Sequence, residues 1–498
     1  MAMTLRKTGS TLRSNFVPGP WTSSGIDLHL EVDSAVGRRI AIENALRQAI
    51  RDGRLPPGSR LPSSRALAAE LGVARGTVTA AYDQLVAEGY LSTRIGSGTL
   101  VAGLPQSRPP AVPPQRRAPT FRYDLRPGSP DVTAFPTAAW LRATRRALAR
   151  APGSAYDYAE PQGRVELRRA LAEYLGRVRG VRAAPEQIVV TSGYVQALAL
   201  LTRVLAGAHG PAVIAMEDPG LAYHRNVVRH NGGRVVALPV DAQGARTDLL
   251  STPEYADVRA AVLTAAHQYP MGVTLHPDRR RAAVAWALDR DGLVIEDDYD
   301  GEFRYDRQPV GALQGTAPDH VAYVGTTSKT LGPALRLAWL VLPDRWIEPV
   351  VHAKRHTDAH TEVIGQLTLA EMINSHAYDR HVRSCRLRYR RRRDLLARLL
   401  GSLSARFDVD GIAAGLHVTI MLPDSGPSEP DVLRAAHMRG PALDGLGDYW
   451  HVPGRHPQGV IVGYSTPSES AYPAALDALV GVLTGGAGKS GATGAVRG

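Results

Sequence analysis

The sequence has almost no cysteine and no long apolar stretch. Cys385 is the one cysteine among 498 residues, which excludes an internal disulfide framework and is typical of proteins in a reducing cytoplasm. No stretch approaches the roughly 18 apolar residues of a membrane-spanning helix, and the first residues lack the apolar segment of a secretory signal. With 44% hydrophobic and 21% charged residues, the composition predicts a soluble cytoplasmic protein with no membrane partner.

Lysine is also scarce, which makes one lysine informative. Of 59 lysine and arginine residues, four are lysine: Lys7, Lys329, Lys354 and Lys489. Lys329 follows an apolar run and three hydroxyl residues, and Arg336 stands seven residues later. Arginine cannot replace lysine where a primary amine must form a Schiff base, because its guanidinium stays protonated. The pattern indicates either an aldehyde-binding amine beside a phosphate-binding arginine or an ordinary solvated lysine.

The length predicts two or three domains, because one hydrophobic core rarely serves so long a chain. A proline-rich stretch with three arginines and no acid reads as a linker, since such composition cannot enter a core. Downstream, helical patterns alternate with short Val/Ile/Leu strands, which predicts an α/β domain with a largely parallel sheet. The expected segments are a flexible arm (1–33), a compact module (34–102), the linker (103–120), the α/β domain (121–484) and a disordered tail (485–498).

The compact module has the pattern of a helix-turn-helix. Apolar residues at helical spacing predict a first helix over 38–51. A short helix is expected over 63–72, ending in glycine, and a longer one begins three residues later within 73–91. Two helices joined in this way are typical of DNA-binding proteins, where the second enters the major groove. Residues 92–102 then predict two short strands, a wing.

The charge of this module supports nucleic acid as a partner. Residues 34–102 hold nine arginines and five acids, a net charge of +4, and the linker adds +3 to a chain total of +12. The module resembles the GntR-type winged helix. That resemblance implies that these residues face double-stranded DNA: Arg65, Arg75, Gly76 and Thr77 on the helices, and Gly96, Ser97, Gly98 and Thr99 in the wing. Ala74 stands where the family often has serine or asparagine, so one cap or phosphate contact would be missing.

Two further segments carry chemistry in the α/β domain. Ser192, Gly193 and Tyr194 lie between a strand and a helix, where free backbone N–H groups bind phosphate. Asp297 and Tyr299 end another apolar strand, at the sheet edge where ligands gather. A carboxylate there can hold a pyridine nitrogen protonated. The structural alternative for each segment is an ordinary strand–helix junction or a helix cap, and no metal site is predicted.

Together with the Lys329 segment, these motifs resemble fold-type I aminotransferases. Joined to the upstream winged helix, the chain resembles the MocR/GabR family of chimeric transcription regulators over about residues 34–483. The resemblance implies a winged helix-turn-helix joined by a proline-rich linker to a large domain of the pyridoxal-phosphate-dependent transferase fold and a small α+β C-terminal domain. It also implies a homodimer.

The resemblance assigns residues to the cofactor, pyridoxal phosphate. Lys329 would form the Schiff base, Asp297 would pair with the ring nitrogen, and Tyr299 would bond the ring hydroxyl. Tyr158 would reach a phosphate bound in the other subunit. The remaining expected neighbours are six residues around the phosphate and two beside the ring: Ser192, Gly193, Tyr194, Thr326, Ser328 and Arg336, with Gln268 and Tyr269.

Two departures from the family's pattern bear on function. Leu221 stands where the family usually has an aromatic that stacks on the pyridine ring, a contact worth about 1 kcal/mol, and Tyr223 is a candidate substitute. Residues 457–469 contain no arginine to grip an α-carboxylate; the nearest upstream is Arg455. These departures predict a regulator without efficient transamination that senses the cofactor itself or a small amine or amino-acid effector. The alternatives are an active aminotransferase with a DNA-binding head and a cofactor-free dimeric regulator.

A run of seven arginines between residues 382 and 394 has two interpretations. One is a second contact to DNA or to another domain. The other, which we favour, is a solvated helix face, since the family often has arginine-rich helices at this place.

Overall fold

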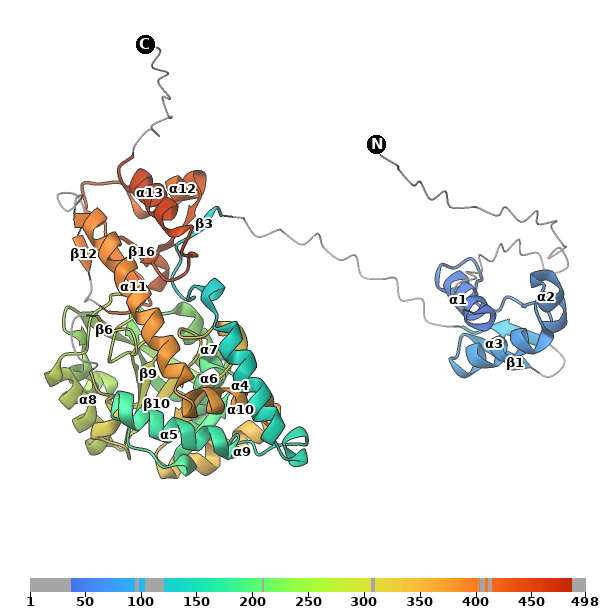
Figure 1. Cartoon of the computed structure of the whole chain (residues 1–498), viewed down its shortest axis with the longest axis horizontal. Helices are drawn as coiled ribbons and strands as arrows, with labels where there is room; N and C mark the ends of the chain where they lie inside the picture. The colour runs from blue at the N-terminus through green and yellow to red at the C-terminus, as the bar shows by residue number, and fades with distance from the viewer. Residues whose placement is uncertain are drawn as a thin grey trace, which may run out of the picture. The chain divides into compact units, whose positions relative to one another are not determined.

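The computed structural model describes residues 37–94, 98–103, 121–207, 210–305, 310–401, 403, 408–410 and 414–485. The chain divides into two compact units, Met1–Ala118 and Pro119–Gly498 (Figure 1). The expected arm, nearly all of the linker and tail, and the wing residues Gly96 and Ser97 lie outside the described residues. No helix among the described residues is long and apolar enough to cross a membrane.

The described part of the first unit contains three helices and a β-hairpin. Its elements are α1 (Arg38–Arg51), α2 (Ser64–Leu71), α3 (Arg75–Ala87), β1 (Leu91–Arg94) and β2 (Gly98–Val101). The Ser63 side chain caps α2 by accepting from the Ala66 amide, and Gly72 ends that helix at φ 61°. No side chain caps α3 at Ala74. β1 and β2 pair antiparallel, so the unit is a helix-turn-helix followed by a wing.

The second unit is built on an eight-stranded sheet. Its strands are β4 (Ile188–Thr191), β5 (Ala212–Asp218), β6 (Gly233–Asp241), β7 (Gly244–Ala245), β8 (Val258–Leu263), β9 (Leu293–Asp298), β10 (Val321–Thr326) and β11 (Ala338–Val341). They lie in the order β4-β11-β10-β9-β8-β5-β6-β7, and the pairings of β11 and β7 are antiparallel while the others are parallel. The largely parallel sheet therefore gathers the carboxyl ends of β4, β5, β8, β9 and β10 at one edge.

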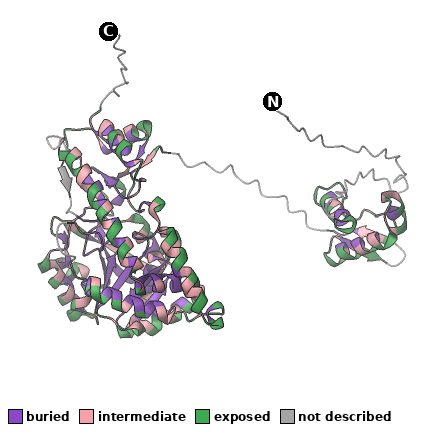
Figure 2. Cartoon of the chain, viewed as in Figure 1, coloured by how far each residue is buried: buried purple, intermediate pink, exposed green. Residues whose placement is uncertain are grey.

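Helices cover both faces of this sheet, as expected for strands that are buried throughout. In β10, Ala322 and Val324 pack into the cluster on one face, while Val321 and Tyr323 point to the other. The helices of the first face are α6 (Tyr194–Ala206), α7 (Ala222–His230) and α9 (Asp344–Asp358), and those of the second are α5 (Val165–Arg179), α8 (Pro277–Arg290) and α10 (Val363–Asn374), with α4 (Thr137–Arg150) against α10. Figure 2 shows the buried strands between helices with exposed outer faces.

A smaller domain completes the second unit. Its antiparallel sheet has the order β12-β13-β16-β15, with β12 (Asp408–Asp410), β13 (His417–Met421), β15 (Asp444–Gly445) and β16 (Gly459–Gly463). β14 (Pro441–Ala442) pairs with β3 (Tyr123–Asp124) near the start of the unit. The helices are α11 (Ala377–Gly401), which runs from the large domain into the small one (Figure 1), α12 (Glu429–Arg439) and α13 (Tyr472–Leu483).

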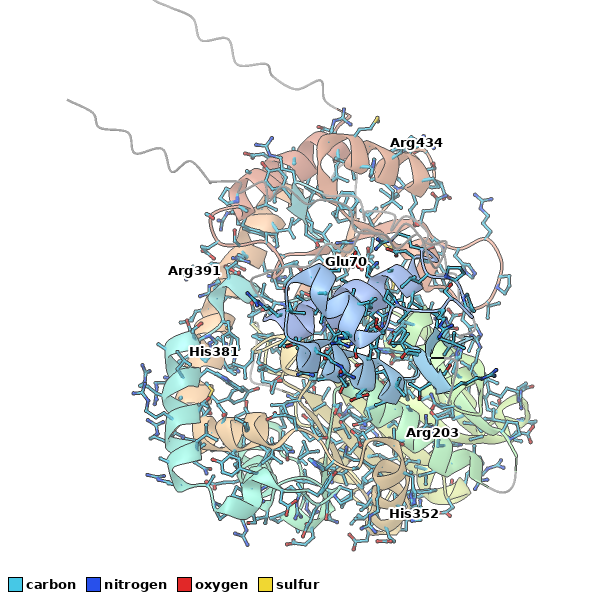
Figure 3. The ribbon with its side chains drawn as sticks, turned by 90° about the vertical axis from the view of Figure 1, so that its right-hand side faces the viewer. Glu70, Arg203, His352, His381, Arg391 and Arg434 are labelled. Carbon is cyan, nitrogen blue, oxygen red and sulfur yellow. The ribbon has the colours of Figure 1, made fainter. Side chains whose placement is uncertain are left out.

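The arginine run lies on α11 and is only partly a solvated face. Arg391 is exposed (Figure 3), but Arg392 is buried and forms ion pairs of 2.9 Å with both Asp131 and Glu469. Cys385, on the same helix, is buried in the small-domain core, and burial raises the pKa of its thiol to about 11. The helix thus joins segments that are distant in the sequence, a role that neither interpretation of the run included.

Candidate functional site

A cavity of about 290 Å³ lies at the edge where the parallel strands end. The large domain contributes side chains that follow β4, β5, β8, β9 and β10, and the small domain contributes residues from β13, β15 and the short 3-10 helix η11 (Leu446–Tyr449). Of the residues predicted from the sequence, these line the cavity: Tyr194, Tyr269, Asp297, Tyr299, Thr326, Ser328, Lys329 and Arg336. The structure therefore brings segments more than a hundred residues apart into one site.

Lys329 lies in the turn after β10 with its amine at the cavity. Nζ donates a hydrogen bond to the Gly128 carbonyl oxygen. Burial lowers the pKa of the lysine, against the opposing charges of Asp300 and Asp297. A lowered pKa increases the neutral fraction of the amine, which is the nucleophilic form. The environment thus suits reaction with a carbonyl carbon.

Asp297 is buried at the end of β9 with an unsatisfied oxygen. Its Oδ1 and the hydroxyl of the neighbouring Tyr194 are both buried, and neither forms a hydrogen bond of good geometry among the described residues. Burial raises the pKa of Asp297 to about 8. The phenol is near enough to oppose the rise in the pKa of the carboxyl. An unpaired buried carboxylate is costly, so this position favours a ligand that brings a protonated nitrogen.

Tyr299 lies on the cavity wall with a buried network behind it. Its hydroxyl is 3.0 Å from Nδ1 of His267, and the same nitrogen is 2.9 Å from Oδ2 of Asp300. Burial raises the pKa of Tyr299 well above its usual range. The phenol therefore stays protonated and faces the cavity from a fixed position.

The start of α6 and the Lys329 turn form an anion-binding corner. Gly193, at φ 101°, precedes the first helical residue, and a Cβ there would lie 2.5 Å from Nη2 of Arg336. That nitrogen donates to the Ser192 carbonyl oxygen over 2.7 Å. The Thr326 hydroxyl donates to Oγ of Ser328 over 2.9 Å. A helix N-terminus, hydroxyls and a guanidinium at one place are the groups that bind phosphate.

A partly buried ion pair lies behind this corner. Lys354 is fully buried on α9, and its Nζ lies 2.8 Å from Oδ1 of Asp358. Oδ2 of Asp358 accepts from Nε2 of Gln196 over 2.7 Å, and Gln196 accepts from the Ser192 amide over 2.7 Å. Sequence reasoning assigned Lys354 no role, although the scarcity of lysine was the available signal.

Other predicted residues lie elsewhere in the chain. The Tyr158 side chain is 90% exposed and does not line the cavity of its own chain. Gln268 is buried behind the wall, where its amide nitrogen donates to the carbonyl oxygens of Pro219 and Tyr269. Tyr223 is also largely exposed and outside the lining, so it is not the substitute for the missing aromatic at Leu221.

The DNA-facing candidates lie at the surface of the first unit. Arg75 begins α3 and is exposed, and its Nε contacts Oγ of Ser64 at 3.4 Å. Arg65 and Gly76 are also exposed, and Thr77 is half-buried. In the wing, Gly98 is exposed and Thr99 half-buried at the start of β2.

Both units match models of known families. Residues 39–101 match the bacterial regulatory proteins of the gntR family, and residues 127–426 match aminotransferase class I and II. The chain is 35% identical to the HTH-type pyridoxine biosynthesis transcriptional regulator PdxR of Corynebacterium glutamicum, over 85% of this chain and 91% of that protein. It is 32% identical to the probable rhizopine catabolism regulatory protein MocR of Rhizobium meliloti, over 88% and 92% respectively.

The chain belongs to the MocR family of transcriptional regulators. Among solved structures, an archaeal alanine:glyoxylate aminotransferase matches with a TM-score of 0.67 and 25% identity, covering 73% of this chain and 91% of that one. The predicted family resemblance and fold class are thereby confirmed. The gntR-family domain implies DNA binding, and the aminotransferase fold implies a pocket of the kind that binds pyridoxal phosphate.

The cavity of this MocR-family chain includes residues that sequence reasoning missed. His224 lines it, with its ring 4.6 Å from that of Tyr194, and burial lowers the pKa of the imidazole to about 4. Glu217 accepts from the Thr264 amide over 3.0 Å, and burial raises its pKa to about 7. The acidic end of β5 was a usable signal for Glu217. The small-domain residues of the lining had none: Leu416, His417, Asp444 and Tyr449.

Two arginines are present among the described residues that line the cavity, Arg225 and Arg336. Nη1 of Arg225 donates to the carbonyl oxygens of Gly220 and Tyr449, at 2.6 and 3.0 Å. Its guanidinium is therefore engaged by the backbone. Leu221 lies on the same wall.

Proposed function

We propose that the protein is a DNA-binding transcription regulator whose aminotransferase-like domain binds pyridoxal phosphate through Lys329 and does not transaminate efficiently. Its signal is the cofactor itself or a small amine or amino-acid effector. The observation that carries the proposal is the unsatisfied Oδ1 of buried Asp297, in the same cavity as the Lys329 amine and the guanidinium of Arg336. These three groups match the ring nitrogen, the aldehyde and the phosphate of the cofactor.

Each of the predicted site residues then has a role in holding the cofactor. The cofactor supplies an electron-poor aldehyde that primary amines attack. Lys329 would contribute the amine that holds it, Asp297 would keep the ring nitrogen protonated, and Tyr299 would donate to the ring hydroxyl. The phosphate would be held by Ser192, Gly193, Tyr194, Thr326, Ser328 and Arg336. Tyr269 would lie beside the ring, supported by Gln268, and Tyr158 would serve the site of the partner in a homodimer.

The poor fit to transamination has two supports. Leu221 offers no π-face to the ring, and the guanidinium of Arg225 already donates to backbone carbonyls. Residues 457–469 contain no arginine, so an α-carboxylate would have to share the Arg225 guanidinium with these carbonyl oxygens. The similarity to a pyridoxine biosynthesis regulator supports the cofactor as one candidate signal.

The DNA half would act through α3. Arg75, at its start, would read a guanine edge or hold a phosphate, with Arg65, Gly76, Thr77 and the wing residues Gly96, Ser97, Gly98 and Thr99 nearby. A homodimer in the cytoplasm would place two such domains on repeated half-sites. A ligand changes DNA binding only if it binds two conformations of the protein unequally.

The first experiment titrates the purified protein with pyridoxal phosphate and follows the visible absorption spectrum. Borohydride reduction and peptide mapping then locate the attached cofactor. We expect a new visible band and attachment to the peptide that contains Lys329, and neither in the Lys329→Ala variant. Attachment at Lys354 instead contradicts the proposal. No band at saturating cofactor also contradicts it and favours a cofactor-free dimeric regulator.

Amino-group transfer is measured on the same preparation. Rapid transfer from an amino acid to a keto acid would favour an active aminotransferase with a DNA-binding head.

A further inference from the structure

The small domain places a carboxylate on the cavity wall. Asp444 begins β15 and Tyr449 ends η11, and both line the cavity. The Tyr449 hydroxyl donates to Oδ2 of Asp444 over 3.1 Å and lies 3.0 Å from the hydroxyl of Tyr269. Two phenols and one carboxylate therefore form a hydrogen-bonded chain along this wall.

Asp444 has no ion pair among the described residues. The guanidinium of Arg126 is near enough to influence its pKa, but its nitrogens form bonds of 3.0 and 2.8 Å with the two carboxylate oxygens of Asp124. The two arginines of the cavity do not pair with Asp444, because Arg225 donates to the backbone and Arg336 lies in the anion-binding corner. Partial burial raises the pKa of Asp444, which is the direction expected of a carboxylate without a counterion.

Tyr449, whose hydroxyl bonds Asp444, belongs to a cluster of aromatic rings on this wall. The Tyr269 ring lies 5.5 Å from the ring of Tyr449, 4.8 Å from that of His417 and 6.1 Å from that of Tyr299. Burial lowers the pKa of His417 well below its usual range, so its ring is neutral. Electron-rich rings beside a carboxylate are the environment that binds an organic ammonium group. A ligand carboxylate would meet repulsion from Asp444 at the same place.

We propose that this wall selects an effector with a second ammonium group, of the α,ω-diamine class, one amine lying toward Lys329 and the other held by Asp444. The inference rests on the proposed function for the orientation of the first amine. The ammonium–carboxylate contact itself involves only residues of this chain and needs no cofactor.

The test compares three ligands with the same four-carbon chain: 1,4-diaminobutane, 1-aminobutane and 4-aminobutanoate. Binding to the full-length protein is measured by calorimetry, with and without bound pyridoxal phosphate. We expect the diamine to bind about tenfold more tightly than either other ligand, which corresponds to one hydrogen-bonded charge pair. Asp444→Asn should weaken diamine binding about tenfold and leave 1-aminobutane unchanged.

Asp424→Asn is the matched control, because Asp424 is an exposed carboxylate of the small domain that does not line the cavity. It should bind all three ligands like the unaltered protein. If Asp444→Asn proves unstable in a thermal melt, the ligand series on the unaltered protein decides alone.

Equal affinity for the three ligands overturns the inference. Preference for 4-aminobutanoate also overturns it and points to Arg225 as a carboxylate ligand. A diamine preference that Asp444→Asn does not alter also overturns it. Failure of the proposed function is distinguishable, because it appears as no visible band with pyridoxal phosphate while the cofactor-free titrations still report on Asp444.

Discussion

Asp297 carries a free-energy cost that the cofactor would remove. An acid whose pKa is raised by folding stabilises the native state below its unfolded value, and this stability is lost as pH rises through the folded value. For Asp297 these values are roughly 3.9 in an unfolded chain and about 8 in the folded one. The carboxylate should therefore destabilise the cofactor-free protein increasingly over this range.

We predict that the cofactor-free protein loses stability relative to Asp297→Asn as the pH rises from about 4 to about 8, by an amount on the order of a few kcal/mol. Thermal or urea unfolding of both proteins across this range measures the difference. Comparison with the variant is needed because burial also raises the pKa of Glu217 and Glu302 to about 7. With pyridoxal phosphate bound, the cationic ring should make the stability difference between the two proteins nearly independent of pH. A stability difference that does not change with pH in the absence of the cofactor would contradict the raised pKa of Asp297.

At the scale of single residues, sequence reasoning was limited by helix phase. Leu221, His224 and Arg225 line the cavity, whereas Tyr223 points outward. Residues three and four apart share one helix face, so the side chains that follow Leu221 depend on α7 beginning at Ala222. A short run after a proline and glycine does not fix that starting point, and Tyr223 was therefore the wrong aromatic to consider.

Among the helices, α3 has no side-chain cap at its N-terminus and begins with an exposed arginine, Arg75. We predict that Arg75→Ala lowers affinity for operator DNA by about tenfold or more, because a bidentate base contact contributes about 1–3 kcal/mol of discrimination. Binding of pyridoxal phosphate should not change. Fluorescence anisotropy with operator and scrambled DNA measures the first effect, and the absorption titration measures the second.

Arg38→Ala is the control, since Arg38 is an exposed arginine at the start of α1. It should reduce affinity for both DNA sequences slightly and equally. Unchanged operator binding by Arg75→Ala would place the recognition surface elsewhere.

Motifs within one element were readable from the sequence, and contacts between elements were not. A few adjacent residues are enough to identify the turn after β4, the end of β9 and the Lys329 turn. Asp444 and Tyr449 lie in short elements of the small domain, and only tertiary packing brings them to the cavity. The role of Lys354 likewise depends on its contacts, because it pairs with Asp358, which accepts a hydrogen bond from Gln196. The sequence does not show that these residues lie beside Ser192.

In the expected homodimer, Tyr158 would contact the cofactor bound to the partner, and variants of Tyr158 test this. Its side chain is 90% exposed and outside the cavity of its own chain, yet Tyr158→Phe should weaken cofactor binding about tenfold, since a hydrogen bond to a charged group contributes about 1.5–3 kcal/mol. Tyr156→Phe is the matched control, because Tyr156 is also exposed and two residues away. Absorption titration of each variant measures the affinities.

Mixed dimers make this prediction decisive. When Lys329→Ala chains are combined with Tyr158→Phe chains, each mixed dimer should contain one site with both native residues and recover tight binding there. No recovery would assign Tyr158 to some role other than the site of the partner.

The buried state of Cys385 has a practical consequence for the two units. Its thiol is 2% exposed and its pKa is raised to about 11, so at neutral pH it is both shielded and protonated and should resist maleimide reagents. A cysteine introduced at a surface position of either unit would then be the reactive thiol, and the native residue could be kept. Fluorophore pairs attached in this way would report the separation of the DNA-binding and aminotransferase-like units in solution as ligands are added.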